Sequence, residues 1–158
     1  MADQGDISVG AGVGFWDYKE QDGFNFSPLS LEAGVDYGLL TNLDLRVNIG
    51  LGISEEIEIL SGGNELTFSI DHYINIYLKP KLSIENLSMY PLIGYSTTRF
   101  DATYNNHSIS DTANGFSYGI GASYSFSNSS EITFEWRQQA DTDDYELSGF
   151  SIGFLADI

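Results

Sequence analysis

The sequence predicts an all-β fold, an eight-stranded antiparallel up-and-down transmembrane β-barrel. Apolar and polar side chains alternate strictly in eight segments, short and long connections alternate between them, and the polar face is rich in glycine. The chain has 158 residues, three Pro and no Cys, which suits one domain over residues 1–158 and excludes a disulfide scaffold. No apolar run reaches the about 18 residues of a membrane helix, whereas a tilted barrel strand needs only about 9–11.

Each predicted strand carries apolar side chains on one side and small or polar side chains on the other. The eight segments are residues 7–16, 30–39, 43–52, 70–79, 89–96, 116–126, 131–137 and 149–158. Pro91 falls inside the fifth segment, where it favours a bulge or a local shift of register, because proline cannot donate to a ladder.

The connections between these segments differ in length in a regular order. Short turns are expected near residues 41–42, 85–87 and 127–130, and longer polar links near 19–28, 54–66, 100–114 and 138–146. All short turns then fall at one end of an up-and-down barrel and all long links at the other, which is typical of outer-membrane barrels.

The polar face is the side that we expect to line the lumen. It carries twelve of the 17 glycines, and glycine on an exposed strand face weakens the strand without packing against anything. Inside a narrow barrel, glycine leaves room for larger neighbours, and charges of both signs can pair. The predicted interior network consists of Glu32, Asp36, Arg46, Lys79, Glu135 and Arg137.

The apolar face carries no charged residue in any of the eight segments, as a lipid-facing wall requires. A Lys or Arg there would cost about 2–4 kcal/mol at the bilayer midplane. Aromatic residues lie mostly toward the segment ends, where interfacial girdles belong. The predicted girdle comprises Phe15, Tyr37, Tyr95, Tyr118, Tyr124, Phe126 and Trp136. A soluble ligand-binding β-barrel with these residues in its core remains an alternative.

Three segments carry a family resemblance. Residues 88–96 (SMYPLIGYS), 114–122 (NGFSYGIGA) and 148–154 (SGFSIGF) resemble strands of the OmpX/Ail family of small outer-membrane proteins. The resemblance implies a barrel without a pore, strands that project from the cell surface, and a role in adhesion or in resistance to host defences. Members usually end in an aromatic residue, whereas this chain ends in Ile158.

The segment before the fourth strand is expected to form a surface hairpin above the membrane, carrying Glu55, Glu56, Glu58 and Glu65. Its exposed edge could accept a strand from an extracellular protein partner. The carboxylates of this hairpin and of residues 141–146 lack the spacing of a calcium loop, so we expect neither a metal site nor any other cofactor.

The most probable function on these grounds is non-enzymatic: membrane integrity, adhesion or surface defence. A lipid A-modifying hydrolase is the alternative from another class, and His107, Ser108 and Asp111, expected in a loop, are its only candidate triad. Expected partners are outer-membrane lipid and lipopolysaccharide, and the barrel is expected to be a monomer. The net charge of −17 excludes nucleic acid as a partner. We expect the bacterial outer membrane as the location, with an export signal already removed.

Overall fold

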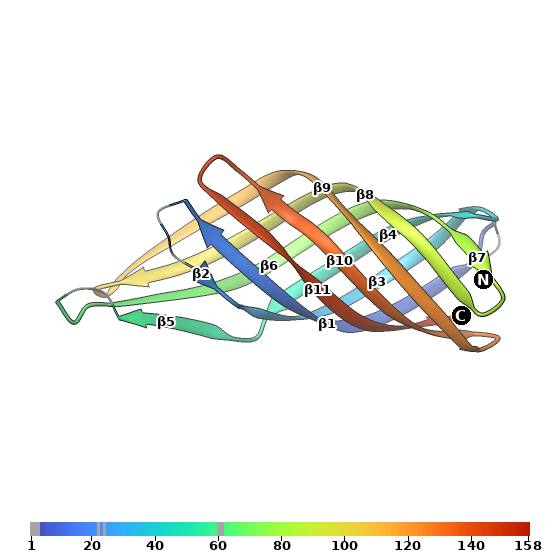
Figure 1. The fold of residues 1–158 in the computed structure, drawn as a ribbon, viewed down its shortest axis with the longest axis horizontal. Coiled ribbons are helices and arrows are strands. Elements are labelled where there is room, and N and C mark those ends of the chain that lie inside the picture. The colour runs from blue at the N-terminus through green and yellow to red at the C-terminus, as the bar shows by residue number, and fades with distance from the viewer. Residues whose placement is uncertain (1–3, 22, 24, 60–61) are drawn as a thin grey trace.

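The computed structural model describes residues 4–21, 23, 25–59 and 62–158 and shows one closed antiparallel sheet (Figure 1). Its strands are β1 (Ile7–Glu20), β2 (Asn25–Phe26), β3 (Leu29–Leu40), β4 (Leu43–Gly52), β5 (Glu55–Ile59), β6 (Glu65–Pro80), β7 (Leu82–Ile84), β8 (Leu87–Tyr104), β9 (His107–Ser127), β10 (Ser130–Asp141) and β11 (Tyr145–Asp157). No helix in the described part of the chain is long and apolar enough to cross a membrane.

Eight long strands form the barrel wall. Around the barrel they follow the order β1, β3, β4, β6, β8, β9, β10 and β11, and the pairing of β1 with β11 closes the ring. The short strands β2, β5 and β7 extend β3, β4 and β6 after brief interruptions. The predicted eight-stranded antiparallel barrel is confirmed. Closure matters because a sheet edge in lipid would leave backbone groups without hydrogen-bond partners.

All three predicted short turns lie at one end of the barrel, called here the turn end. The turns join β3 to β4, β7 to β8, and β9 to β10, and the start of β1 and the C-terminus lie beside them (Figure 1). The opposite end, the open end, carries the extensions of the strands. There β5 and the β8–β9 hairpin extend furthest from the barrel.

Two of the links predicted at the open end are wrong, because the strands continue through them. Residues 100–114 form the upper part of β8 and β9, which pair without interruption up to Tyr104 opposite His107. Asn105 and Asn106 make the turn with φ of 47° and 63°, a left-handed conformation that asparagine tolerates well. Likewise β10 runs to Asp141 and β11 starts at Tyr145, so only a short turn separates them.

The strand register departs from simple alternation in β6. A shift between Ile70 and His72 turns Ile70 inward, although the two-residue alternation places both on the outer face. The bulge or register shift expected at Pro91 is wrong. Pro91 pairs with Ile120 in an unbroken register. The interruption falls instead in the strand on the other side of β8, between β6 and β7.

Glycines on the inner face make room for tyrosine rings from neighbouring strands. Gly50 lies opposite Tyr73 and Gly121 opposite Tyr90 in the strand pairings. A Cβ atom added at either glycine would overlap the tyrosine ring opposite it. Both rings are almost completely buried, so they have little space in which to move away.

This packing predicts different costs for two alanine substitutions in the same strand. Gly121→Ala should lower the free energy of unfolding by about 1–3 kcal/mol, because the new methyl group displaces the Tyr90 ring. Gly115→Ala, where nothing lies within 4 Å of the added Cβ, should change it by less than about 0.5 kcal/mol. Urea unfolding of both variants in micelles measures the difference, and equal costs would contradict the packing.

Candidate functional site

The outer wall of the barrel is a continuous apolar belt. Its members include Val35, Ile49, Ile76 and Phe154, each more than two fifths exposed. Every predicted girdle residue except Trp136 is strongly exposed on this wall, and Trp136 is half-buried with its ring against Tyr118. By strand register, the turn-end group is Tyr37, Tyr124 and Phe126, and the group toward the open end is Phe15, Tyr95, Tyr118 and Trp136. Phe116 and Phe150 join the second group.

At the rim of this belt nearer the open end, apolar side chains change from pointing outward to pointing inward. In β1, Phe15 points outward, but beyond it Asp17 and Lys19 point outward while Trp16 and Tyr18 are buried inside. The same reversal occurs in β8, where Arg99 is exposed and Phe100 is buried. A change of outer surface from apolar to charged is expected where a wall passes from lipid into water.

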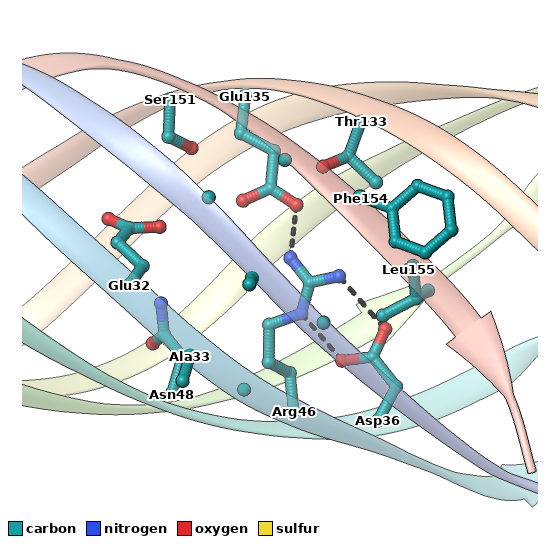
Figure 2. A pocket seen from close by; sticks show the side chains of 15 residues that line it. Glu32, Ala33, Asp36, Arg46, Asn48, Thr133, Glu135, Ser151, Phe154 and Leu155 are labelled. Atoms are coloured by element: carbon teal, nitrogen blue, oxygen red, sulfur yellow. Dashed lines mark hydrogen bonds and ion pairs between the residues drawn. The ribbon is translucent and has the colours of Figure 1, made fainter.

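The lumen inside the belt holds a cluster of buried charges around Arg46. Its guanidinium donates to both carboxylate oxygens of Asp36, at 2.6 Å from Nε to Oδ1 and 2.9 Å from Nη2 to Oδ2 (Figure 2). It also donates from Nη1 to Glu135. Lys79 Nζ donates to Asp36 Oδ2 at 2.8 Å. These groups come from β3, β4, β6 and β10, so the network ties opposite parts of the wall together.

Tyrosine rings and a second ion pair complete this network. Arg137 pairs with Glu32, which also accepts a hydrogen bond from the Tyr73 hydroxyl. The Tyr90 hydroxyl donates to Glu135 at 2.7 Å, and Lys79 lies over the Tyr90 ring. All six residues predicted for the interior thus lie on the inner face, in two groups. One group contains Glu135 and the other contains Arg137, which stands two residues further along the same face of β10.

Sequence reasoning missed one further ion pair, between Lys81 Nζ and Asp44 Oδ2 at 2.7 Å. Asp44 has a polar position on an inner face, which could have indicated it, but Lys81 lies beyond the predicted strand. With this pair, ion pairs inside the described lumen join four basic and four acidic side chains, and these paired charges balance one another. The net charge of −17 is therefore carried elsewhere on the chain.

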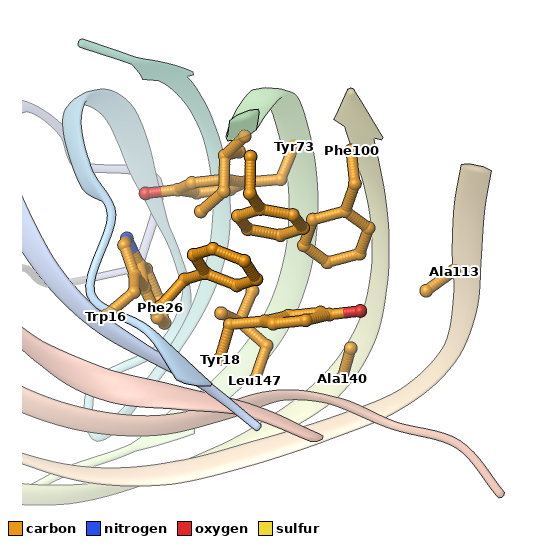
Figure 3. Packing of buried hydrophobic residues seen from close by; sticks show 10 residues of the cluster. Trp16, Tyr18, Phe26, Tyr73, Phe100, Ala113, Ala140 and Leu147 are labelled. Carbon is orange, nitrogen blue, oxygen red and sulfur yellow. The ribbon is translucent and has the colours of Figure 1, made fainter. Parts of the chain in front are cut away.

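Above the charged network, toward the open end, the lumen is apolar. Buried rings of Tyr18, Phe26, Phe68 and Phe100 pack in stacked and tilted pairs, with Leu147 beside them (Figure 3). The Tyr18 and Phe68 ring centroids are 4.3 Å apart. The expectation of a polar interior throughout is therefore wrong: it describes the level of the belt, and an aromatic cluster fills the lumen above it. A cavity of about 40 Å³, room for a few water molecules, lies beside Arg46.

Four strands rise from the level of the aromatic cluster as a projecting sheet, made of β5 and of residues 65–70, 99–104 and 107–113 of β6, β8 and β9. The predicted hairpin of β5 and β6 belongs to it, with Glu55 and Glu65 exposed. The side chains of Glu56 and Glu58 lie outside the described residues. The hairpin is thus part of a larger sheet, because β8 and β9 continue beside it.

A family model described as the outer membrane protein beta-barrel domain matches residues 1–156. The chain belongs to this outer-membrane barrel family. The resemblance to small outer-membrane proteins of the OmpX/Ail type is confirmed, and so is the bacterial outer membrane as the location. No curated protein matches the chain.

Solved structures share the barrel of this family member at low sequence identity. Ail, the attachment invasion locus protein of Yersinia pestis, is 16% identical, with a TM-score of 0.71 over 98% of this chain and 99% of that chain. Neisserial surface protein A is 12% identical, with a TM-score of 0.72 over 96% of this chain and 97% of that chain. The N-terminal barrel of Pseudomonas aeruginosa OprF is 13% identical, with a TM-score of 0.63 over 98% of this chain and 99% of that chain.

The candidate triad of a hydrolase is not assembled in this outer-membrane barrel. His107, Ser108 and Asp111 lie along β9 rather than in a loop. Neighbours in a strand point to opposite faces, so Ser108 faces away from His107 and Asp111. His107 and Asp111 share a face but lie about 13 Å apart along the strand. Among the described residues, no three acidic or histidine side chains converge on a point that could hold a metal ion.

The charged network predicts a large loss of stability when Arg46 is replaced. Arg46→Met leaves Asp36 and Glu135 buried without their main counter-charge, and removing one partner of a buried ion pair costs about 3–5 kcal/mol. Arg99→Met removes an exposed arginine, 3.8 Å from Asp71, and should cost less than about 1 kcal/mol. Unfolding in urea tests both variants. A cost for Arg46→Met as small as that for Arg99→Met would show that the network does not hold the barrel together.

Proposed function

We propose that this chain is a non-enzymatic, monomeric, single-domain barrel that acts in cell-surface adhesion by binding a protein partner along its projecting sheet. The closed wall and the paired lumen charges make the barrel a rigid membrane anchor in contact with outer-membrane lipid and lipopolysaccharide. The projecting sheet is the part that extends into water, which places it where a partner can approach.

The observation that carries this proposal is a free strand edge at the open end. The pairing of β10 with β9 reaches only Gln138 opposite Tyr118, whereas β9 continues to His107. Along residues 107–117 of β9, therefore, no pairing with β10 exists in the described part of the chain. Such an edge presents backbone donors and acceptors in the spacing that an added strand needs.

The acidic charge of the projecting sheet limits which kinds of partner can bind to it. The segments that form the projecting sheet contain six carboxylates, from Glu55, Glu56, Glu58, Glu65, Asp101 and Asp111, and Arg99 is their one basic residue besides His107. A basic extended segment fits this surface. One Ail structure was solved with the heparin analogue sucrose octasulfate, but a polyanion would be repelled by the acidic surface of the present chain.

A trimmed hairpin tests the proposal without disturbing the barrel. Deleting residues 101–104 and 107–110 leaves Phe100 and Asp111 flanking the Asn105-Asn106 turn and removes eight residues of the projecting sheet. The probe is a fluorescently labelled peptide of alternating lysine and valine, eight residues long. Its anisotropy should rise on mixing with the full chain in micelles, and the trimmed chain should bind at least about tenfold more weakly.

Two control peptides separate strand addition from simple charge attraction. A peptide of alternating lysine and proline has the same charge but cannot donate along a ladder, so it should not bind. Alternating glutamate and valine should be repelled. Equal binding of the lysine–valine peptide to the full and trimmed chains, or equal binding of the lysine–proline peptide, would refute strand addition at this edge.

A further inference from the structure

The open end of the barrel encloses a cavity of about 420 Å³, called here the outer cup. Its apolar lining comes from Tyr18, Phe68, Phe100 and Tyr145, which are the upper members of the aromatic cluster and its neighbour. The Tyr18 ring lies 5.4 Å from Phe100 and 5.3 Å from Tyr145 between centroids. This volume lies within the range of small-molecule sites, which are typically apolar with a few placed polar groups.

The charged groups of the outer cup are carboxylates. Glu20, Asp111 and Asp144 line it together with the amide Gln21, and among the described residues no basic side chain does. Two of them bind the ring hydroxyls: the Tyr18 hydroxyl donates to Glu20 Oε1 at 2.8 Å, and the Tyr145 hydroxyl donates to Asp111 Oδ2 at 3.4 Å. The hydroxyls therefore point at the acidic groups, and each tyrosine contributes its ring to the apolar lining.

Both tyrosines remain neutral at physiological pH. Burial, followed by the hydrogen bond to Glu20, raises the pKa of Tyr18 well above its ordinary value. Burial and the neighbouring Asp111 raise the pKa of Tyr145 to about 12. The cup thus presents neutral aromatic rings together with carboxylates. On the lumen side of the aromatic cluster, the Arg137 guanidinium lies 5.1 Å from the Trp16 ring centroid.

We propose that the outer cup binds a small organic cation, an alkylammonium or quaternary ammonium group carried on an apolar body. Aromatic rings attract such cations through their negative faces, and the three carboxylates add long-range attraction. An anion would be repelled, and a neutral apolar ligand would leave the acidic groups without a counter-charge. A bare metal ion suits the cup poorly, because no three carboxylates of the described residues converge on one point. This proposal does not require strand addition along β9, although Ile109 and Asp111 of that strand line the cup.

Choline and its neutral isostere 3,3-dimethylbutan-1-ol distinguish charge from shape. Each is titrated into the full chain in maltoside micelles, and the ring resonances of Tyr18 and Tyr145 are followed by NMR. Choline should shift both resonances and saturate, and the isostere should bind at least about tenfold more weakly, since cation–π and Coulombic attraction are lost. Equal binding of the two compounds, or no shift with choline, would overturn the proposal.

Matched substitutions inside and outside the outer cup test whether choline binds there. Asp111→Asn removes a charge from the cup and should weaken choline binding about threefold to tenfold. Asp17→Asn removes the same charge from the outer face of β1 and should leave binding unchanged. Tyr145→Leu should weaken binding further by removing a ring. A difference in migration between unboiled and boiled protein on SDS gels checks that each variant has folded. Equal losses for Asp111→Asn and Asp17→Asn would show that choline responds only to overall charge.

Discussion

A wall that faces lipid cannot contain a charge or an unpaired backbone group, and the rest of this structure follows from that constraint. The backbone requirement closes eight strands into a ring in which β1 pairs with β11. The charge requirement sends the Asp, Glu, Lys and Arg side chains of the belt inward. In a lumen this narrow, an isolated charge would be severely destabilising, so acids and bases must occur there in equal number and in contact. Arg46 meets this requirement because its guanidinium forms ion pairs with both Asp36 and Glu135.

The requirement for an uncharged outer face no longer applies where the wall leaves the membrane. Beyond Phe15 the outer face carries Asp17 and Lys19, and the apolar residues turn inward to form the aromatic cluster. The molecule therefore has two kinds of interior, a neutral ionic one at the level of lipid and an apolar one at the level of water. Four of the six basic residues form ion pairs inside the lumen. The parts of the chain that face water are therefore strongly acidic. Both surface proposals depend on this unequal distribution of charge.

Most of the barrel could be predicted from the sequence, because two-residue alternation and two-residue turns are local signals. The inward positions of the network could be read in the same way, but their partners could not: Arg46 and Glu135 are 89 residues apart and meet only through barrel closure. The continuation of β8 and β9 was missed because the outer face of residues 100–114 is polar where the strands stand in water, so the apolar outward pattern of the belt strands is lost there. The aromatic cluster was missed because its alternation has the opposite sense, with Asp17 outward and Tyr18 inward. The inward turn of Ile70 depends on a bulge that no local pattern indicates.

The orientation of the wall can be measured directly in β1. The chain contains no cysteine, so single cysteines at Gly12, Val13, Phe15, Asp17 and Lys19 can each carry a spin label in bilayers. The account predicts that labels at Val13 and Phe15 collide with oxygen dissolved in lipid, and that labels at Asp17 and Lys19 collide with a water-soluble nickel chelate. The contradicting result is that labels at Val13 and Phe15 are shielded from both oxygen and the chelate while a label at Gly12 collides with the chelate. The apolar face would then be a sealed core, and the account would be wrong.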